Sequence, residues 1–150
     1  MMRRSYLCER AEEALSDAGF EPATLEREMY DEEEFGNAEA VFTLGSLRSR
    51  FLRDRAQDFL ELGSTAEPRR FFLVDDVEVA MGWKKVEEGL AKQYPDDLKD
   101  VVARVGAKRK ELEHALSLTN GPKSIQRFET AATKRGEHFL SLLKQLAKPS

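Results

Sequence analysis

The chain has 150 residues, of which 41% are hydrophobic and 35% charged, and its formal net charge is −4. This length is typical of one domain that builds a core without covalent staples, and the charged fraction indicates a surface dense in ions. The single cysteine, Cys8, excludes an internal disulfide and a multi-cysteine metal site, and no run approaches the roughly 18 apolar residues of a membrane span. With no uncharged signal-like stretch after Arg3 and Arg4, we expect a cytoplasmic protein without a membrane partner.

The N-terminal segment predicts a helix over residues 3–18. Leu7, Ala11 and Leu15 recur on one side of it, and Gly19 is a typical C-terminal stop. Cys8 lies beside this stripe, and we interpret it as a small core residue because the sequence ties no basic activating group to it.

Four segments then predict strands at short spacing. They cover residues 23–30, 38–44, 47–53 and 56–62. Gly45-Ser46 between the second and third is a hairpin signal. In the third, burying Phe51 turns Arg48 and Arg50 to the opposite face, because side chains alternate along a strand.

Beyond the connector at Pro68, the sequence is helical. The predicted helices run from Asp75 or Asp76 to about Met81, over 84–93, from Asp96-Asp97 to about Leu116, and from about Ile125 to Ala147. The last two have a short join and should form an antiparallel hairpin.

These elements predict a single α+β domain over residues 1–150. A helix-plus-sheet core over 1–94 contains an antiparallel meander of three or four strands covered by the N-terminal helix. A C-terminal helical hairpin over 95–150 follows.

Charge is unevenly distributed along the chain. Residues 21–40 carry eight acids against one arginine, and residues 101–150 carry ten Lys or Arg against four Glu. Such a layout can steer a charged partner, or the two segments can neutralise each other across the fold. Close like charges also favour a solvated loop at the acidic run. The candidate partner-binding residues are Glu26, Glu28, Asp31, Glu32, Glu33, Glu34, Arg48, Arg50, Arg53 and Arg55.

No group of residues indicates a reaction. The only histidines, His114 and His138, lie in predicted helices away from any nucleophile motif. Acids at 75, 76 and 78, or at 96, 97 and 100, could hold magnesium, but we interpret adjacent acids before a helix as caps. Phosphate-binding glycine motifs are absent. We therefore expect no catalytic residue, metal or cofactor.

Nucleic acid is an alternative partner. Arg48 and Arg50, beside Arg53 and Arg55, could contact a phosphate backbone, with the basic helical segments 104–110 and 134–135 extending the footprint. Asp54, Asp58 and Glu61 lie among these arginines, however, so salt bridges within the chain explain the same pattern without a ligand.

A resemblance covers about residues 6–83. An N-terminal helix ending in Gly19-Phe20, followed by EEFGNAEAVF, LRSRFLRDRAQDFLEL and FFLVDDVEVAMGW, resembles small uncharacterised bacterial proteins, some of which look like immunity proteins of polymorphic toxin systems. The resemblance implies a cytoplasmic protein that binds a cognate toxin and blocks its active site or its access to substrate. The acidic residues would complement a basic toxin cleft, and the arginines an acidic one. We favour this hypothesis over a nucleic-acid-associated regulator and, third, a hydrolase.

Overall fold

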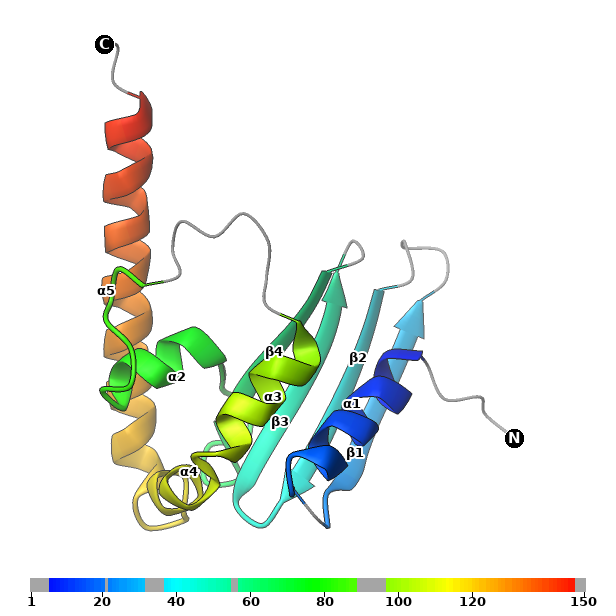
Figure 1. Cartoon of the computed structure of the whole chain (residues 1–150). Helices are drawn as coiled ribbons and strands as arrows, with labels where there is room; N and C mark the ends of the chain where they lie inside the picture. The colour runs from blue at the N-terminus through cyan, green and yellow to red at the C-terminus, as the bar shows by residue number, and fades with distance from the viewer. Residues whose placement is uncertain (1–5, 21, 32–36, 55–56, 89–96, 148–150) are drawn as a thin grey trace.

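The computed structural model describes residues 6–20, 22–31, 37–54, 57–88 and 97–147. Helix α1 (Tyr6–Asp17) precedes an antiparallel sheet, and four helices follow within the described residues, so the predicted α+β class is confirmed (Figure 1). The strands are β1 (Thr24–Asp31), β2 (Asn37–Leu44), β3 (Leu47–Asp54), β4 (Gln57–Ser64) and β5 (Phe71–Leu73). The later helices are α2 (Val74–Ala80), α3 (Leu98–Gly106), α4 (Arg109–Ala115) and α5 (Gly121–Ala147).

The sheet is a meander in the order β1-β2-β3-β4-β5, with every neighbouring pair antiparallel. The predicted hairpin turn is confirmed: Leu44 pairs with Leu47, and Gly45 has a φ of 59° that favours glycine. Five strands form where three or four were expected. The additional strand, β5, is a three-residue apolar run that sequence alone cannot distinguish from the start of a helix. Its pairing with β4 makes it a strand.

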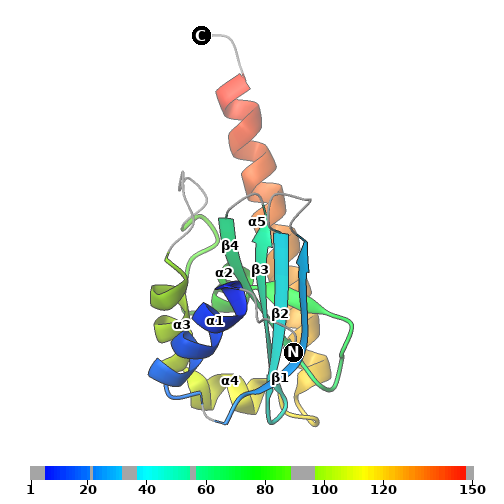
Figure 2. The same ribbon diagram turned by 90° about the vertical axis from the view of Figure 1, so that its right-hand side faces the viewer.

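The core lies between one face of the sheet and the helices α1 and α3 (Figure 2). Alternate residues of the strands point into it, including Ala40 and Phe42 from β2 and Phe51 from β3. The Phe42 and Phe51 rings meet edge to face with centroids 5.8 Å apart. Cys8 is fully buried in this core, as predicted.

The C-terminal region differs from the predicted hairpin of two helices. The helix expected from 97 to 116 is broken at Ala107-Lys108 into α3 and α4. Helix α3 then packs on α1, whereas α5 packs on α2. Val102 and Val105 face the core before the break, and Leu112 and Leu116 are fully buried after it.

The helix predicted over 84–93 is wrong over its described part, since residues 84–88 form a bend followed by a turn. Arg135 of α5 donates to the carbonyl oxygens of Val86 and Glu88, both at 3.0 Å, which fixes this segment by its backbone. Residues 89–93 lie outside the described residues.

The acids interpreted as caps have different roles. Asp97 caps α3, accepting from the backbone nitrogen of Lys99 at 2.8 Å. Helix α2 instead begins at Val74 and has no side-chain cap. Asp75 pairs with Lys84, and Asp76 lies 3.1 Å from Arg135, so both acids bind cations in place of the helix terminus.

Helix α5 is 27 residues long, and its buried residues end at Arg135. In both views its C-terminal half stands clear of the rest of the molecule (Figures 1 and 2).

Candidate functional site

The face of the sheet that α1 and α3 leave open carries most of the strand charges. We call this surface the arginine face, and it includes Glu26, Arg27, Glu39, Arg48, Arg50, Glu61 and Phe71. Period-two alternation sends these side chains opposite to the core. A bulge between Leu25 and Arg27 inserts Glu26, and both Glu26 and Arg27 bond to side chains of this face.

Four of the charges form a row across four strands. Arg27 Nε donates to Glu39 Oε1 at 2.8 Å, and Arg50 Nε donates to Glu39 Oε2 at 2.7 Å. Arg50 also reaches Glu61, with its Nη1 3.0 Å from Oε1. Each charge therefore has an opposite charge beside it, and Glu39 is held from both sides.

Arg48 forms a second cluster beside this row and is only 3% exposed. It donates to both carboxylate oxygens of Glu26, at 3.0 and 2.7 Å, and to the carbonyl oxygen of Pro68. Thr43 adds a hydroxyl donor to Glu26 at 2.8 Å. The parity predicted from sequence is confirmed, because Arg48 does turn away from the core, but the side chain is covered.

Phe71 of β5 supports both arginines. The guanidinium carbon of Arg48 lies 4.7 Å from the centroid of its ring, and that of Arg50 lies 5.6 Å away. Beneath the charges Val41 is fully buried. The arginines thus have their orientation fixed by a ring as well as by carboxylates.

Two carboxylates of the face, Glu26 and Glu39, have a pKa below the ordinary value. Hydrogen bonds from Arg48 hold the pKa of Glu26 below its usual value. Burial opposes ionisation of Glu39, yet the bonds from Arg27 and Arg50 outweigh it, so the pKa of Glu39 is also lowered. Ionised acids paired with arginines favour a fixed electrostatic pattern over proton transfer.

The sequence-predicted candidates do not gather in one place. Arg48, Arg50 and Glu26 lie on the arginine face. Arg53 instead lies on the face shared with Phe51, where it pairs with Asp58 at 2.7 Å. Arg10 of α1 reaches the same Asp58 at 3.1 Å, and Tyr6 lies beneath both guanidinium groups.

Two of the remaining candidates, Glu28 and Asp31, lie on β1. Glu28 pairs with Ala40 and so shares the core-side face, and Asp31 ends the strand. Glu32, Glu33, Glu34 and Arg55 lie outside the described residues.

Sequence reasoning missed Arg27, Glu39 and Phe71 as members of the face. The available signal was parity, since Glu39 alternates with Phe42 just as Arg50 alternates with Phe51. Alternation along a single strand does not predict the register in which β1, β2 and β3 pair.

A second surface feature is an open basic groove of about 1120 Å³ between α5 and the segment after α2. Its lining includes the cations Lys84, Lys85, Lys123, Arg127 and Lys134 and the acid Glu87. Lys84 is paired with Asp75.

Two cations of the segment 104–110 form ion pairs within the chain: Arg104 binds Glu78 at 2.8 Å and Arg109 binds Glu113 at 2.8 Å.

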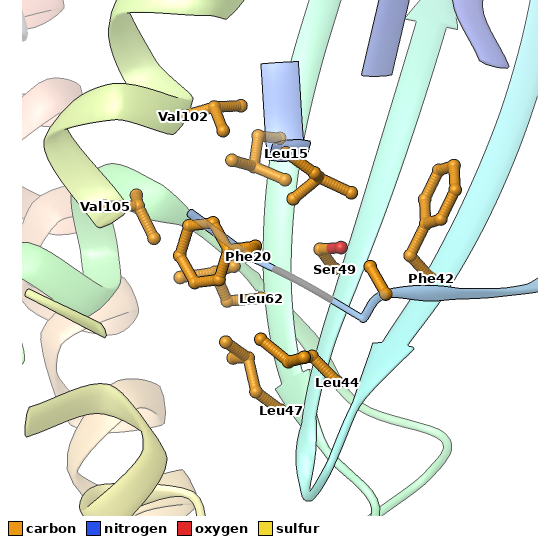
Figure 3. A pocket seen from close by; sticks show the side chains of 11 residues that line it. Leu15, Phe20, Phe42, Leu44, Leu47, Ser49, Leu62, Val102 and Val105 are labelled. Carbon is orange, nitrogen blue, oxygen red and sulfur yellow. The ribbon is translucent and has the colours of Figure 1, made fainter. Parts of the chain in front are cut away.

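The cavity between the sheet and the helices is too small for a substrate. Its free volume is about 10 Å³, room for about one water molecule, and its lining is apolar apart from Ser49 (Figure 3). Within the described ranges, no three His, Cys, Asp or Glu side chains are placed to hold a metal ion. In that same part of the chain, every helix is too short or too polar to cross a bilayer.

Comparisons with protein-family models, with curated proteins and with solved structures give no match for this chain.

Proposed function

We propose that this protein is a non-enzymatic, cytoplasmic binding protein that neutralises a cognate bacterial toxin by occluding its active site, and that the arginine face is the surface that meets the toxin. The observation that carries the proposal is a charged sheet face whose arginines are already oriented. The segments that resemble immunity proteins supply most of its residues.

The composition of the face supports a protein partner. None of the five strands contains a lysine, whereas arginine, phenylalanine and methionine are present, and protein interfaces favour these residues over lysine. Met29 is 63% exposed and Leu73 42%, so both sides of the charged row offer apolar contact area.

Preorganisation supports tight binding. Arginine loses considerable side-chain entropy when a partner immobilises it, and that cost is reduced when carboxylates and a ring already fix the guanidinium. Since Arg27 and Arg50 are balanced by Glu39 and Glu61, the face favours a patterned protein surface over a uniformly negative phosphate backbone.

The direct test is co-expression with the product of the adjacent gene, followed by titration calorimetry of the purified pair. We expect a stoichiometric complex that abolishes the neighbour's toxicity. Met29→Glu should weaken binding at least tenfold, because a new charge would be buried at the interface.

Leu118→Glu is the matched control. Leu118 is 71% exposed and lies in the connection between α4 and α5, outside the strands in sequence. It should bind like the native protein, and both variants should keep the native melting temperature. A neighbour that is neither toxic nor bound, or equal losses in the two variants, would remove support for the proposal.

The basic groove favours a second candidate function, a nucleic-acid-associated regulator. Lys123, Arg127 and Lys134 follow one side of α5 and could contact successive phosphates. Replacing Lys123 and Lys134 with Ala should then weaken DNA or RNA binding and reduce its salt dependence. Absence of binding to either nucleic acid at low salt would exclude this function.

A further inference from the structure

The basic groove beside α5 holds cations that the fold leaves without acidic partners. Lys123, Arg127 and Lys134 lie on its α5 wall, and their spacing puts them on one side of that helix. Lys85 lies on the opposite wall, in the segment that follows α2 and runs beside α5 (Figure 1). Among the described residues, no carboxylate forms an ion pair with any of these four exposed cations.

Other cations of the chain are neutralised where they stand. On the arginine face, for example, Arg27 and Arg50 both bind Glu39. In the groove, Lys123 and Arg127 are instead one helical turn apart on the same wall, and like charges at that spacing destabilise a helix. Crowded cations without carboxylates produce a positive potential in the groove, which favours an anionic ligand.

The floor of the groove is apolar. It is formed by Val79 and Ala80 of α2, by Val86 and by Ala131 of α5, all of which are less exposed than the cations around them. Apolar atoms make up most of the accessible surface of the lining. An apolar centre with a charged rim is the usual anatomy of a surface that binds protein, and the lysines of this groove belong to the rim.

A nucleic acid would use this floor poorly. Surfaces that bind nucleic acids are more polar than those that bind proteins, and single strands normally stack their bases on aromatic side chains. None of the lining residues that the structure describes is aromatic, and Glu87 adds a negative charge among the cations. The lining therefore favours a protein ligand with acidic side chains over a phosphate backbone.

The walls favour a helical ligand. An extended peptide binds by adding a strand to a sheet edge, and a proline-rich peptide needs an aromatic groove. The described lining offers neither, since its regular elements are the helices α2 and α5. An apolar groove instead accepts the apolar side of an amphipathic helix. From Lys123 to Lys134 the α5 wall is roughly 17 Å long, which matches about three turns of such a helix.

We propose that the basic groove binds an acidic amphipathic helix of a partner protein. The apolar side of that helix packs on the floor, and its carboxylates pair with the cations of the rim. The inference goes beyond the proposed function, because it needs neither the arginine face nor a toxin. It also assigns to the groove a different ligand from the nucleic acid of the second candidate function.

Fluorescence anisotropy with a designed, labelled peptide tests the proposal. The peptide is a helix of about four turns with leucine along one side, glutamate on both flanks of the leucines and alanine elsewhere. We expect it to bind the full chain. A peptide with glutamine in place of glutamate, and one with alanine in place of leucine, should each bind at least about tenfold more weakly, because one lacks the charges and the other the apolar side.

Variants of the protein locate the site. Lys123→Glu with Lys134→Glu should weaken binding of the acidic peptide by at least about tenfold. The control, Lys99→Glu with Lys110→Glu, changes the net charge equally at two exposed lysines outside the lining and should bind within about threefold of the native protein. Glu87→Lys should bind more tightly than the native protein, and a gain of affinity cannot result from misfolding.

Several results would overturn the proposal. They are an acidic peptide that binds no better than its glutamine version, equal losses in the groove variant and its control, and a DNA or RNA oligonucleotide that binds the groove when the peptide does not. Met29→Glu, which should weaken toxin binding, should bind the peptide like the native protein. The two proposals can therefore fail separately.

Discussion

Glu39 is the residue on which the arginine face depends. It is only 8% exposed, and it is the one carboxylate of the row that accepts from two arginines. A buried charge is tolerated when its partners are in place, and it becomes costly when either is removed. The acid therefore links β1, β2 and β3 through their side chains as well as through their backbones.

Replacing Glu39 with Gln should lower the free energy of unfolding by roughly 1–3 kcal/mol at neutral pH, because two charge-assisted hydrogen bonds are weakened. The pKa of Glu39 is lower in the folded protein than in the unfolded chain, where it is about 4.3. The ionised carboxylate therefore stabilises the fold fully above about pH 4.3, and this contribution is lost as the pH falls through the pKa of the folded state. Urea titrations of both proteins should converge in acid.

The exposed Glu137 of α5 supplies the control: Glu137→Gln should change stability by less than about 0.5 kcal/mol at either pH. A difference between native protein and Glu39→Gln that stays constant down to pH 3 would contradict the assigned role.

For single residues, the sequence predicted the face of the sheet to which a side chain points but not the residue with which it pairs. The alternation around Phe51 correctly turned Arg48 and Arg50 away from the core, and the same alternation places Arg53 on the core side. It could not predict that Glu26 binds Arg48, since the two are 22 positions apart and meet through a bulge. Salt bridges within the chain were one of the two interpretations of the clustered arginines. Such salt bridges are present at Arg48, Arg50 and Arg53.

Among the elements, the contact between α1 and α3 depends on a missing side chain. A Cβ at Gly106 would lie 2.8 Å from the carbonyl oxygen of Ala18 and 2.9 Å from its Cβ. Neither atom belongs to a flexible chain end, so the helices would have to separate. Gly136 of α5 is the opposite case, since a Cβ there would meet nothing within 4 Å.

The same substitution should thus have opposite effects at the two sites. We expect Gly106→Ala to lower the melting temperature through overpacking, at a cost of about 1–3 kcal/mol, and Gly136→Ala to raise stability by about 0.5–1 kcal/mol, because alanine is the better helix former. Thermal melts followed by circular dichroism measure both. Stabilisation at both positions would show that the two helices do not approach this closely.

Helix and strand existence was largely predictable, and boundaries were not. The pattern at 98, 102 and 105 predicted α3, but the same stripe continues to Leu112 and Leu116 and so did not predict the break at Ala107-Lys108, directly after Gly106. Similarly, Arg135 binds the carbonyl oxygens of Val86 and Glu88 from 49 and 47 positions away. Local propensity contains no information about such contacts.

As a whole, the molecule should unfold as one unit. A single cluster of buried side chains includes Leu7 of α1, Phe51 of β3, Val102 of α3 and Phe128 of α5. The only tryptophan, Trp83, follows α2 and lies 5.3 Å from the ammonium nitrogen of Lys108, so its fluorescence reports on the helical side of the cluster.

We expect fluorescence of Trp83 and far-ultraviolet circular dichroism to give coincident guanidinium transitions. Loss of the Trp83 signal before the dichroism signal would mean that α2, α4 and α5 separate from the sheet, and that the chain has two folding units in place of one.

The strand order leaves β1 at a free margin of the sheet. Its eight residues could in principle recruit the backbone of another polypeptide, which is how amyloid-like stacks begin. The inserted Glu26 interrupts the spacing of amide groups, and Arg27 and Glu28 charge the same stretch. The bulge and the charges therefore disfavour the growth of fibres by addition of strands at β1. Variants with valine or threonine at these three positions should be less soluble and should form fibres.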